Sequence, residues 1–275
     1  MKTNSILFSI FFISLSNFLC AQIDSVKKNN AFPKWEIGLA YNSVEAQMDQ
    51  KLFDTWVFPS ANYYAYFGNK NDRSFSISAI PKYFLSDDVQ LRCEFGFTNI
   101  NMRSYYNGAG DTLSQNQGHI GATGSIIKQD TIQQKIFRFV PGIQWTLTRK
   151  KRVKSYGGIS LCYNYYSKMH WGDFITSLPD TTRRTDYIAT TKGGFQTGIG
   201  LFGGFTVRIY KQIYLGGELS YYLLYYKLGG IQKGEMINYY TSSATEVLLW
   251  SIYDNSSKGV QFSKVIPSFR LCIRI

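Results

Sequence analysis

Two long alternating segments between Gly194 and Tyr226, joined by a short turn at Lys211 and Gln212, constrain this chain more than any other feature. The odd positions of both segments are mostly apolar, whereas the even positions are mostly glycine or polar, among them Glu218. Each segment runs for about fifteen residues, roughly three times the usual length of a strand in a soluble domain. Successive strand residues point to opposite faces, so each segment has one apolar and one mixed polar face. The pattern predicts a transmembrane β-hairpin.

The amino terminus indicates export. Lys2 precedes an apolar run from Ile6 to Leu19, and the small residue Ala21 follows it. A positive start, an apolar core of about 7 to 15 residues and a small residue at the cut are typical of a cleaved secretory signal. Cys20 leaves a lipoprotein alternative open, although bulky Leu19 before it suits lipidation poorly. The predicted parts are a signal peptide over 1–21, a short periplasmic segment over 22–33 and an outer-membrane barrel over 34–275.

Composition agrees with a membrane barrel and points to anionic partners. Only 17% of the residues are charged, where about a quarter is ordinary, yet the mean hydropathy is slightly hydrophilic at -0.18. The formal net charge of +12 falls by one when Lys2 leaves with the signal. A basic exported chain favours the lipopolysaccharide and phospholipid of the outer membrane as partners, and export argues against nucleic acid. No later apolar run is long enough for a spanning helix, which leaves a barrel as the spanning structure.

The same two-residue period recurs along the chain and predicts an all-β, antiparallel, up-and-down transmembrane β-barrel. Eight segments show it: residues 34–44, 75–85, 89–97, 137–147, 159–165, 194–209, 213–225 and 265–275. Long polar connections at 45–72, 104–130, 171–193 and 229–258 alternate with short turns at 86–88, 149–154 and 210–212. This layout predicts extracellular long loops, periplasmic turns and an even strand number. Ala61 to Phe67 also alternate, but one more strand would break the even number, so eight is the prediction.

Aromatic residues on the predicted outward face fall near both ends of the strands, where they would form two interfacial girdles. Trp35, Tyr83 and Trp145 lie near the short turns, and Tyr41, Tyr163, Tyr165, Phe195 and Tyr225 lie near the long loops.

Two short runs, Ile80 to Asp88 and Gly216 to Ser220, resemble outer-membrane β-barrel proteins of the porin-like or PorT-like kind. In that family an aromatic-rich strand enters a tight turn, and another strand carries a glutamate near its middle. Such barrels often end in an aromatic residue that the assembly machinery reads, whereas this chain ends in Ile275. The resemblance implies outer-membrane location, barrel architecture, and the periplasmic chaperones and barrel-assembly machinery as partners. It implies no shared activity.

Charged residues of inward parity are the candidate functional site. They are Glu36, Lys82, Arg92, Glu94, Arg138, Arg208, Glu218, Arg270 and Arg274. An eight-stranded barrel is only wide enough for its own side chains, and buried charges need partners. We therefore expect an arginine–glutamate network that plugs the interior, with a narrow polar path for small anions as the alternative.

The sequence predicts no catalytic, cofactor or metal site. The two histidines, His119 and His170, fall in or beside long loops, and only His170 has a carboxylate and a serine nearby, Asp173 and Ser177, without diagnostic spacing. The cysteines of the mature chain, Cys93, Cys162 and Cys272, do not cluster with the histidines at metal-ligand spacing and are expected to pack as small residues.

Two functions remain open on the sequence alone. The first is a plugged barrel with a structural or partner-binding role, in which the long loops bind an extracellular or envelope protein. Loop aromatics expected to be exposed for this purpose are Tyr105, Tyr106, Trp171, Tyr239, Tyr240 and Trp250. The second is a narrow porin-like channel or transporter for small solutes.

Overall fold

A computed structural model of the protein describes residues 34–44, 73–109, 125–149, 152–177, 183–240, 245–254 and 256–275. The expected signal peptide, the segment 22–33, the first long loop with Ala61 to Phe67, and His119 lie outside the described residues. The stretch Trp35–Ile275 forms one compact unit.

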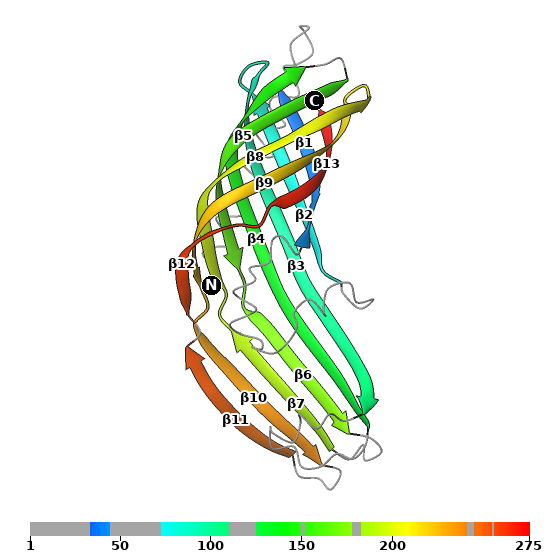
Figure 1. Ribbon diagram of the computed structural model, residues 1–275, viewed down its shortest axis with the longest axis vertical. Helices are drawn as coiled ribbons and strands as arrows, with labels where there is room; N and C mark the ends of the chain where they lie inside the picture. Colours follow the sequence, from blue (N-terminus) through cyan, green and yellow to red (C-terminus); the bar gives the residue numbers. More distant parts are fainter. Residues whose placement is uncertain are drawn as a thin grey trace. The chain divides into compact units, whose positions relative to one another are not determined.

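Within the described residues, eight antiparallel strands close into a barrel (Figure 1). In order around the barrel they are β1 (Trp35–Asn42), β2 (Phe75–Phe84), β3 (Val89–Ala109), β4 (Ser125–Arg149), β5 (Val153–Tyr166), β8 (Gly194–Tyr210), β9 (Ile213–Leu228) and β13 (Ile266–Arg274). Each strand pairs with the next, and β1 pairs with both β2 and β13, which closes the sheet. The predicted eight-stranded antiparallel barrel is confirmed.

The turns at 86–88 and 210–212 lie where the sequence places them, whereas residues 150 and 151 of the third predicted turn lie outside the described residues. Between β2 and β3, the Ser86 hydroxyl accepts a hydrogen bond from the backbone N–H of Val89 at 3.1 Å. Between β8 and β9, the turn is so tight that Lys211 adopts a φ of 26°, in the left-handed region that such hairpin turns require.

The segments predicted as the second, third and fourth long loops contain long strands, which corrects the loop prediction. β6 (Met169–Ser177), β7 (Arg183–Thr191), β10 (Ile231–Tyr240) and β11 (Thr245–Asp254) extend the sheet in the order β3-β4-β6-β7-β10-β11. We call these four strands, with the far halves of β3 and β4, the extension. A further strand, β12 (Ser257–Phe262), continues the pairing along β9 beyond β13.

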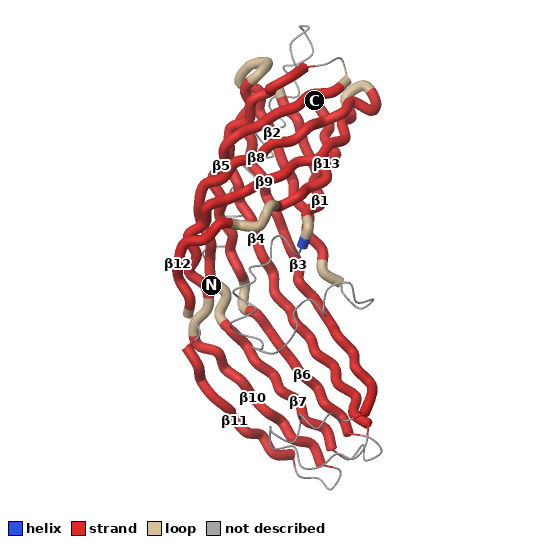
Figure 2. Tube along the Cα trace, viewed as in Figure 1, coloured by secondary structure: helices blue, strands red, loops and turns tan. Residues whose placement is uncertain are grey.

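Strands accordingly make up most of the described chain (Figure 2). None of the described helical structure is long and apolar enough to cross a membrane.

Side-chain polarity inverts along single strands where the barrel gives way to the extension. In β4, the outward side chains are Phe137 and Phe139 in the barrel but Lys135 and Gln133 toward the extension, and all four are exposed. The opposite face changes in the other direction, from the buried Arg138 to the buried isoleucines 132 and 136. The barrel is therefore apolar outside and polar inside, whereas the extension follows the ordinary polarity of a sheet in water.

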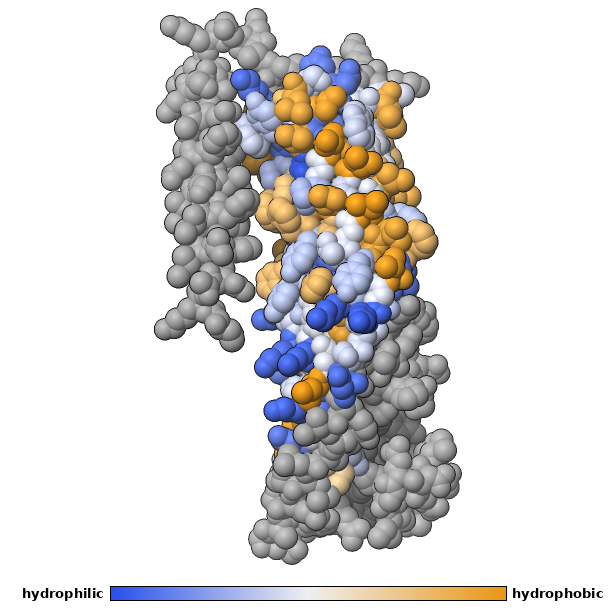
Figure 3. Space-filling model, turned by 90° about the vertical axis from the view of Figure 1, so that its left-hand side faces the viewer, coloured by the Kyte–Doolittle hydropathy of each residue, from blue (hydrophilic) through white to orange (hydrophobic). Residues whose placement is uncertain are grey.

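Exposed apolar side chains cover the outside of the barrel, among them Leu39, Ile199, Leu201 and Phe205, each more than half exposed. On the face seen in Figure 3, hydrophobic residues gather in the upper part and a more hydrophilic surface lies below them. A soluble monomer rarely exposes so large a continuous apolar surface, and a soluble barrel would bury it inside.

Outward aromatic rings contact one another across the strands at both ends of this apolar surface. Near the turns, the Trp35 and Tyr83 rings lie 4.9 Å apart between centroids. Near the extension, a band of ring contacts crosses six strands. Its members are Phe75, Phe97, Phe137 and Tyr165 on β2 to β5, and Tyr163, Phe195 and Tyr225 on β5, β8 and β9. We call this set the aromatic band.

Candidate functional site

The middle of the barrel interior holds a closed set of ion pairs, the central cluster, which comprises Arg92, Glu94, Arg138, Glu218 and Arg270. Arg92 donates from Nη1 to Glu218 Oε2 at 2.7 Å, and Arg270 donates from Nη2 to the other oxygen of Glu218. Glu94 lies 3.4 Å from Arg92, 3.4 Å from Arg138 and 3.9 Å from Arg270. All five side chains are buried, and each lies within ion-pair distance of at least one group of opposite charge.

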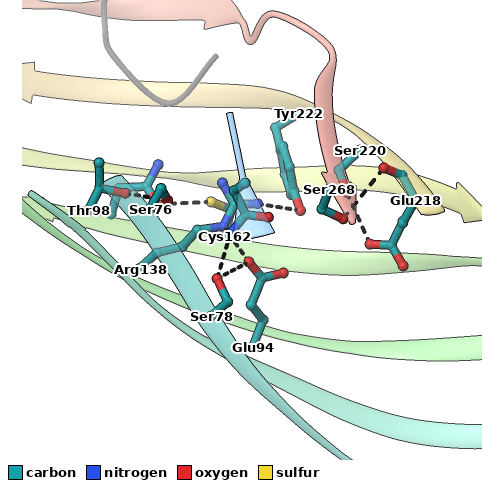
Figure 4. Close-up of polar contacts among 12 residues, drawn as sticks. Ser76, Ser78, Glu94, Thr98, Arg138, Cys162, Glu218, Ser220, Tyr222 and Ser268 are labelled. Carbon is teal, nitrogen blue, oxygen red and sulfur yellow. Dashed lines mark hydrogen bonds and ion pairs between the residues drawn. The ribbon is translucent and has the colours of Figure 1, made fainter. Parts of the chain in front are cut away.

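Hydroxyl groups complete the central cluster. Ser78 donates to Glu94 at 2.9 Å, and Ser220 donates to Glu218 at 3.2 Å. Arg138 also donates to the Tyr222 hydroxyl at 2.7 Å. Figure 4 shows Arg138 between Glu94 and Tyr222, with Ser220 beside Glu218. The carboxylates therefore accept from both cations and hydroxyls, which fixes their positions.

A second group of charges, the turn-side cluster, lies at the end of the barrel that carries the short turns. Glu36 accepts from Lys82 Nζ at 2.7 Å through one oxygen and from Arg274 Nε at 2.8 Å through the other. These residues come from β1, β2 and β13, and the strand register places Glu36 directly beside both partners. This cluster ties the first and last strands together at the barrel seam.

Aromatic rings fill the space around both clusters. The Arg92 guanidinium lies 4.0 Å from the Phe202 ring centroid, and the Arg274 guanidinium lies 4.3 Å from that of Tyr214. Cation–π contacts of this kind stabilise desolvated arginines. Glycines make room for the large groups: a Cβ on Gly204 would come within 2.7 Å of the Tyr156 hydroxyl.

Toward the extension, the interior becomes apolar. The buried residues there form one hydrophobic cluster, the apolar layer, composed of Ile100, Met102, Ile132, Ile136, Tyr166, Met169, Trp171, Ala189, Tyr226 and Leu228. These side chains come from β3 to β7 and β9, so the layer joins the wall of the barrel to the extension. Trp171 belongs to it and is only 7% exposed, which corrects its expected role as an exposed partner-binding residue.

Eight of the nine inward charges named from the sequence are thus buried in the two clusters, and Arg208 is not. Arg208 is exposed, at the turn end of β8. Its register partner on β9 is the buried Tyr214, so Arg208 keeps the inward parity, but it lies at the rim of the barrel beside the turn and outside both clusters. The three cysteines are free thiols, and Cys162 and Cys272 are buried.

The outer face of the extension carries a polar cluster that the sequence did not reveal. Arg184 donates from Nε and Nη2 to the two oxygens of Asp186 at 2.7 and 2.9 Å. Its guanidinium also lies 5.7 Å from the Phe174 ring and 5.6 Å from the Tyr239 ring. The hydrogen bonds to Asp186 raise the pKa of Arg184 above its ordinary value. A cleft of about 310 Å³ adjoins it, lined by Gln129, Phe174, Thr176 and Arg184.

His170, the histidine with a carboxylate and a serine nearby in the sequence, belongs to a strand of the extension. His170 lies within β6 and is exposed. Asp173 and Ser177 belong to the same strand, but their side chains lie outside the described residues. Among the described residues, no group of three or more His, Cys, Asp or Glu is placed to hold a metal ion.

No family model matches the sequence, and no curated protein matches it. Among solved structures, the chain is similar to a major outer membrane protein from Thermus thermophilus, with 11% identity, coverage of 88% of this chain and 99% of that chain, and a TM-score of 0.36. It is also similar to CarO from Acinetobacter baumannii, with 8% identity, coverage of 90% and 100%, and a TM-score of 0.32. The outer membrane protease OmpT from Escherichia coli shows 12% identity, coverage of 88% and 93%, and a TM-score of 0.33.

Identities and TM-scores this low carry no argument about function, so only the residues of this chain bear on what it does. The closed antiparallel strands, the apolar exterior and the charged interior define a β-barrel of the transmembrane type. The narrower resemblance to PorT-like proteins stays a prediction.

Proposed function

We propose that the protein is an integral outer-membrane barrel with a closed interior, which anchors the extension outside the membrane. The apolar exterior of the barrel, bordered by aromatic rings at both ends, supports the membrane assignment. Antiparallel closure leaves no unpaired strand edge in the barrel wall, which is the condition for β-structure in lipid. The short turns then face the periplasm and the extension faces the cell exterior.

Three successive layers of buried side chains carry the proposal of a closed interior. The turn-side cluster occupies one end, the central cluster occupies the middle, and the apolar layer lies toward the extension. Ions cross a pore only where polar groups or water replace their hydration shell, and the apolar layer consists mainly of buried apolar side chains. Apart from Arg92 with Glu94, which share β3, the ion pairs of the two clusters join residues from different strands and so help to fix the strand register.

The channel alternative draws on the excess of positive charge inside the barrel. Five buried cations face three buried carboxylates in the two clusters, which leaves an excess of two positive charges. An interior of this sign would favour small anions if water reached it.

Reconstitution in planar bilayers tests the closed interior. We expect no stable conductance from the folded wild-type chain, because the apolar layer interrupts any hydrated path. Glu218→Gln serves as the sensitised variant: a conducting barrel gated by Glu218 would show raised conductance or anion leak, whereas a closed barrel would lose only folding stability. Stable wild-type conductance, with heat-modifiable folding intact, would contradict the proposal.

The extension is the part of the protein that we propose contacts an extracellular or envelope protein. Its outer face presents the half-exposed Arg184, which pairs with the buried Asp186 and contacts two aromatic rings, and the cleft adjoins it. Arginine and tyrosine are among the residues that contribute most to protein interfaces. A non-enzymatic role fits this surface, and the periplasmic chaperones and barrel-assembly machinery would act before it is displayed.

A further inference from the structure

Five exposed lysines lie along one boundary, between the aromatic band and the extension. Lys135 is on β4, Lys168 lies between β5 and β6, Lys192 lies between β7 and β8, Lys227 is on β9 and Lys258 is on β12. Because β4, β5, β8, β9 and β12 are successive neighbours in the sheet, these lysines follow one another around the barrel. We call them the basic arc.

Backbone contacts place the five lysines near the same level of the barrel wall. The carbonyl of Lys135 accepts from the Ser167 N–H at 2.9 Å, directly before Lys168. The carbonyl of Gly193, directly after Lys192, accepts from the Gly229 N–H at 2.7 Å, two residues beyond Lys227. Lys258 is the register partner of Lys227. The arc is therefore a band of positive charge, and its members are not scattered along the barrel axis.

The aromatic band lies immediately on the barrel side of the arc. Phe137, Tyr165 and Tyr225 each lie two or three residues from a lysine of the arc, toward the barrel. Aromatic rings in membrane proteins sit at the level of the lipid head groups. With the barrel in a membrane, the arc is thus at the depth of the head-group phosphates.

Lys227 and Lys258 lie directly opposite each other on β9 and β12. Directly opposite residues on antiparallel strands have Cβ atoms about 4.5 to 5.5 Å apart, and like charges in this position destabilise the pair. In the part of the chain that the structure describes, the ion pairs formed by carboxylates involve none of the five lysines. An anion between the two ammonium groups would remove the repulsion.

We infer that the basic arc binds the phosphate groups of anionic lipid in the leaflet next to the extension, with Lys227 and Lys258 sharing one phosphate. This inference rests on the proposed membrane location and names the lipid chemistry that the location brings into contact. Lysine binds phosphate as a compact point charge with freely rotating donors, and a phosphomonoester carries enough negative charge for two lysines. The aromatic rings below would lie at the boundary between the head groups and the acyl chains of the same lipid.

Thermal unfolding in two kinds of vesicle tests the inference. The chain from Gln22 to Ile275 is reconstituted in phosphatidylcholine alone, or in phosphatidylcholine with a minor fraction of phosphatidic acid, and the unfolding temperature is read from the heat-modifiable gel shift. We expect phosphatidic acid to raise the wild-type unfolding temperature by several degrees, and salt to weaken the effect. The double variant Lys227→Gln/Lys258→Gln should lose most of this gain.

The direction in which a lysine variant changes the unfolding temperature in neutral lipid distinguishes phosphate binding from a purely structural role of the lysines. In phosphatidylcholine alone, Lys258→Gln removes the repulsion, so its unfolding temperature should equal or exceed that of the wild type. Lys233→Gln, an exposed lysine of β10 outside the arc, is the matched control and should keep the full gain with phosphatidic acid. A variant less stable than the wild type by the same amount in both lipids would overturn the inference.

Two further results distinguish a failure of the lipid assignment from a failure of the membrane location. If inorganic phosphate in the buffer stabilises the protein in phosphatidylcholine as much as phosphatidic acid does, the assignment to lipid is wrong. Flotation of the vesicles reports on the proposed location separately: protein that floats in both lipids but gains nothing from phosphatidic acid contradicts the arc alone. Protein that does not float contradicts the membrane proposal on which the arc depends.

Discussion

Replacing Glu218 by Gln is expected to lower the free energy of unfolding by about 3 to 5 kcal/mol, the range observed when one partner of a buried ion pair is removed. Glu218 holds both Arg92 and Arg270. Glutamine preserves the size of the side chain and one acceptor oxygen but removes the charge. Glu94 would then be the one carboxylate left in the central cluster to face three buried arginines, since Glu36 lies in the separate turn-side cluster.

Urea titration of the heat-modifiable folded form measures this change. Glu235→Gln is the matched control, because Glu235 is an exposed residue of β10 and its replacement should leave stability within a few tenths of a kcal/mol. Equal effects of the two substitutions would mean that the central cluster contributes no more than a surface charge. The ion pairs would then not be what stabilises the barrel interior.

Replacing Gly204 by Ala is the second large effect that we expect, about 1 to 3 kcal/mol of destabilisation, as for overpacked sites in other proteins. Gly204 is the register partner of Glu218 and faces the interior. A Cβ at this position would lie 2.3 Å from the carbonyl oxygen of Gly217 and 2.7 Å from the Tyr156 hydroxyl. One of these is backbone, so relief requires the strands to move apart beside the central cluster.

The neighbouring Gly203 provides an internal control on the opposite face. A Cβ there would meet only the carbonyl oxygen of Tyr156, at 3.7 Å, which is ordinary contact. Gly203→Ala should therefore be neutral or slightly stabilising, because alanine restricts the unfolded chain. Comparing the unfolding midpoints of the two variants tests directly which of the two glycines of β8 faces the barrel interior. A greater loss for Gly203→Ala than for Gly204→Ala would reverse the faces assigned to this strand.

Alternation alone was enough to predict the barrel, because every strand that faces lipid must repeat its apolar residues with the same period. The hairpin from Gly194 to Tyr226 shows this most clearly: Leu201 and Leu219 are exposed, and Glu218 is buried. Parity likewise indicated which charges lie inside. It could not indicate which of them pair, because pairing depends on the stagger of strands far apart in sequence.

The extension was not predicted because its outward face is polar and its buried face is apolar, the reverse of the barrel. The apolar residues of the outward face end at Phe137 in β4 and at Tyr165 in β5. Toward the extension, Lys135 and Ser167 follow on the outward side. The alternation itself continues, with Ile132 and Trp171 now buried. Had alternation with an apolar inward face also been taken to indicate strands, part of the extension would have been predicted. Arg208 has the inward parity that the pattern predicts, but it lies at the turn end of β8, where its side chain is exposed.

The native cysteines allow the most direct test of a closed barrel in a membrane, with no substitution needed. Cys162 and Cys272 are buried inside, while Cys93 is on the outward face of β3. In vesicles, a small water-soluble thiol reagent should modify none of the three in the folded chain expressed from Gln22, and a lipid-soluble maleimide should modify Cys93 alone. All three should react after unfolding. Rapid modification of Cys162 or Cys272 by the water-soluble reagent in the folded protein would show a hydrated interior, and modification of Cys93 by that reagent would contradict the membrane location.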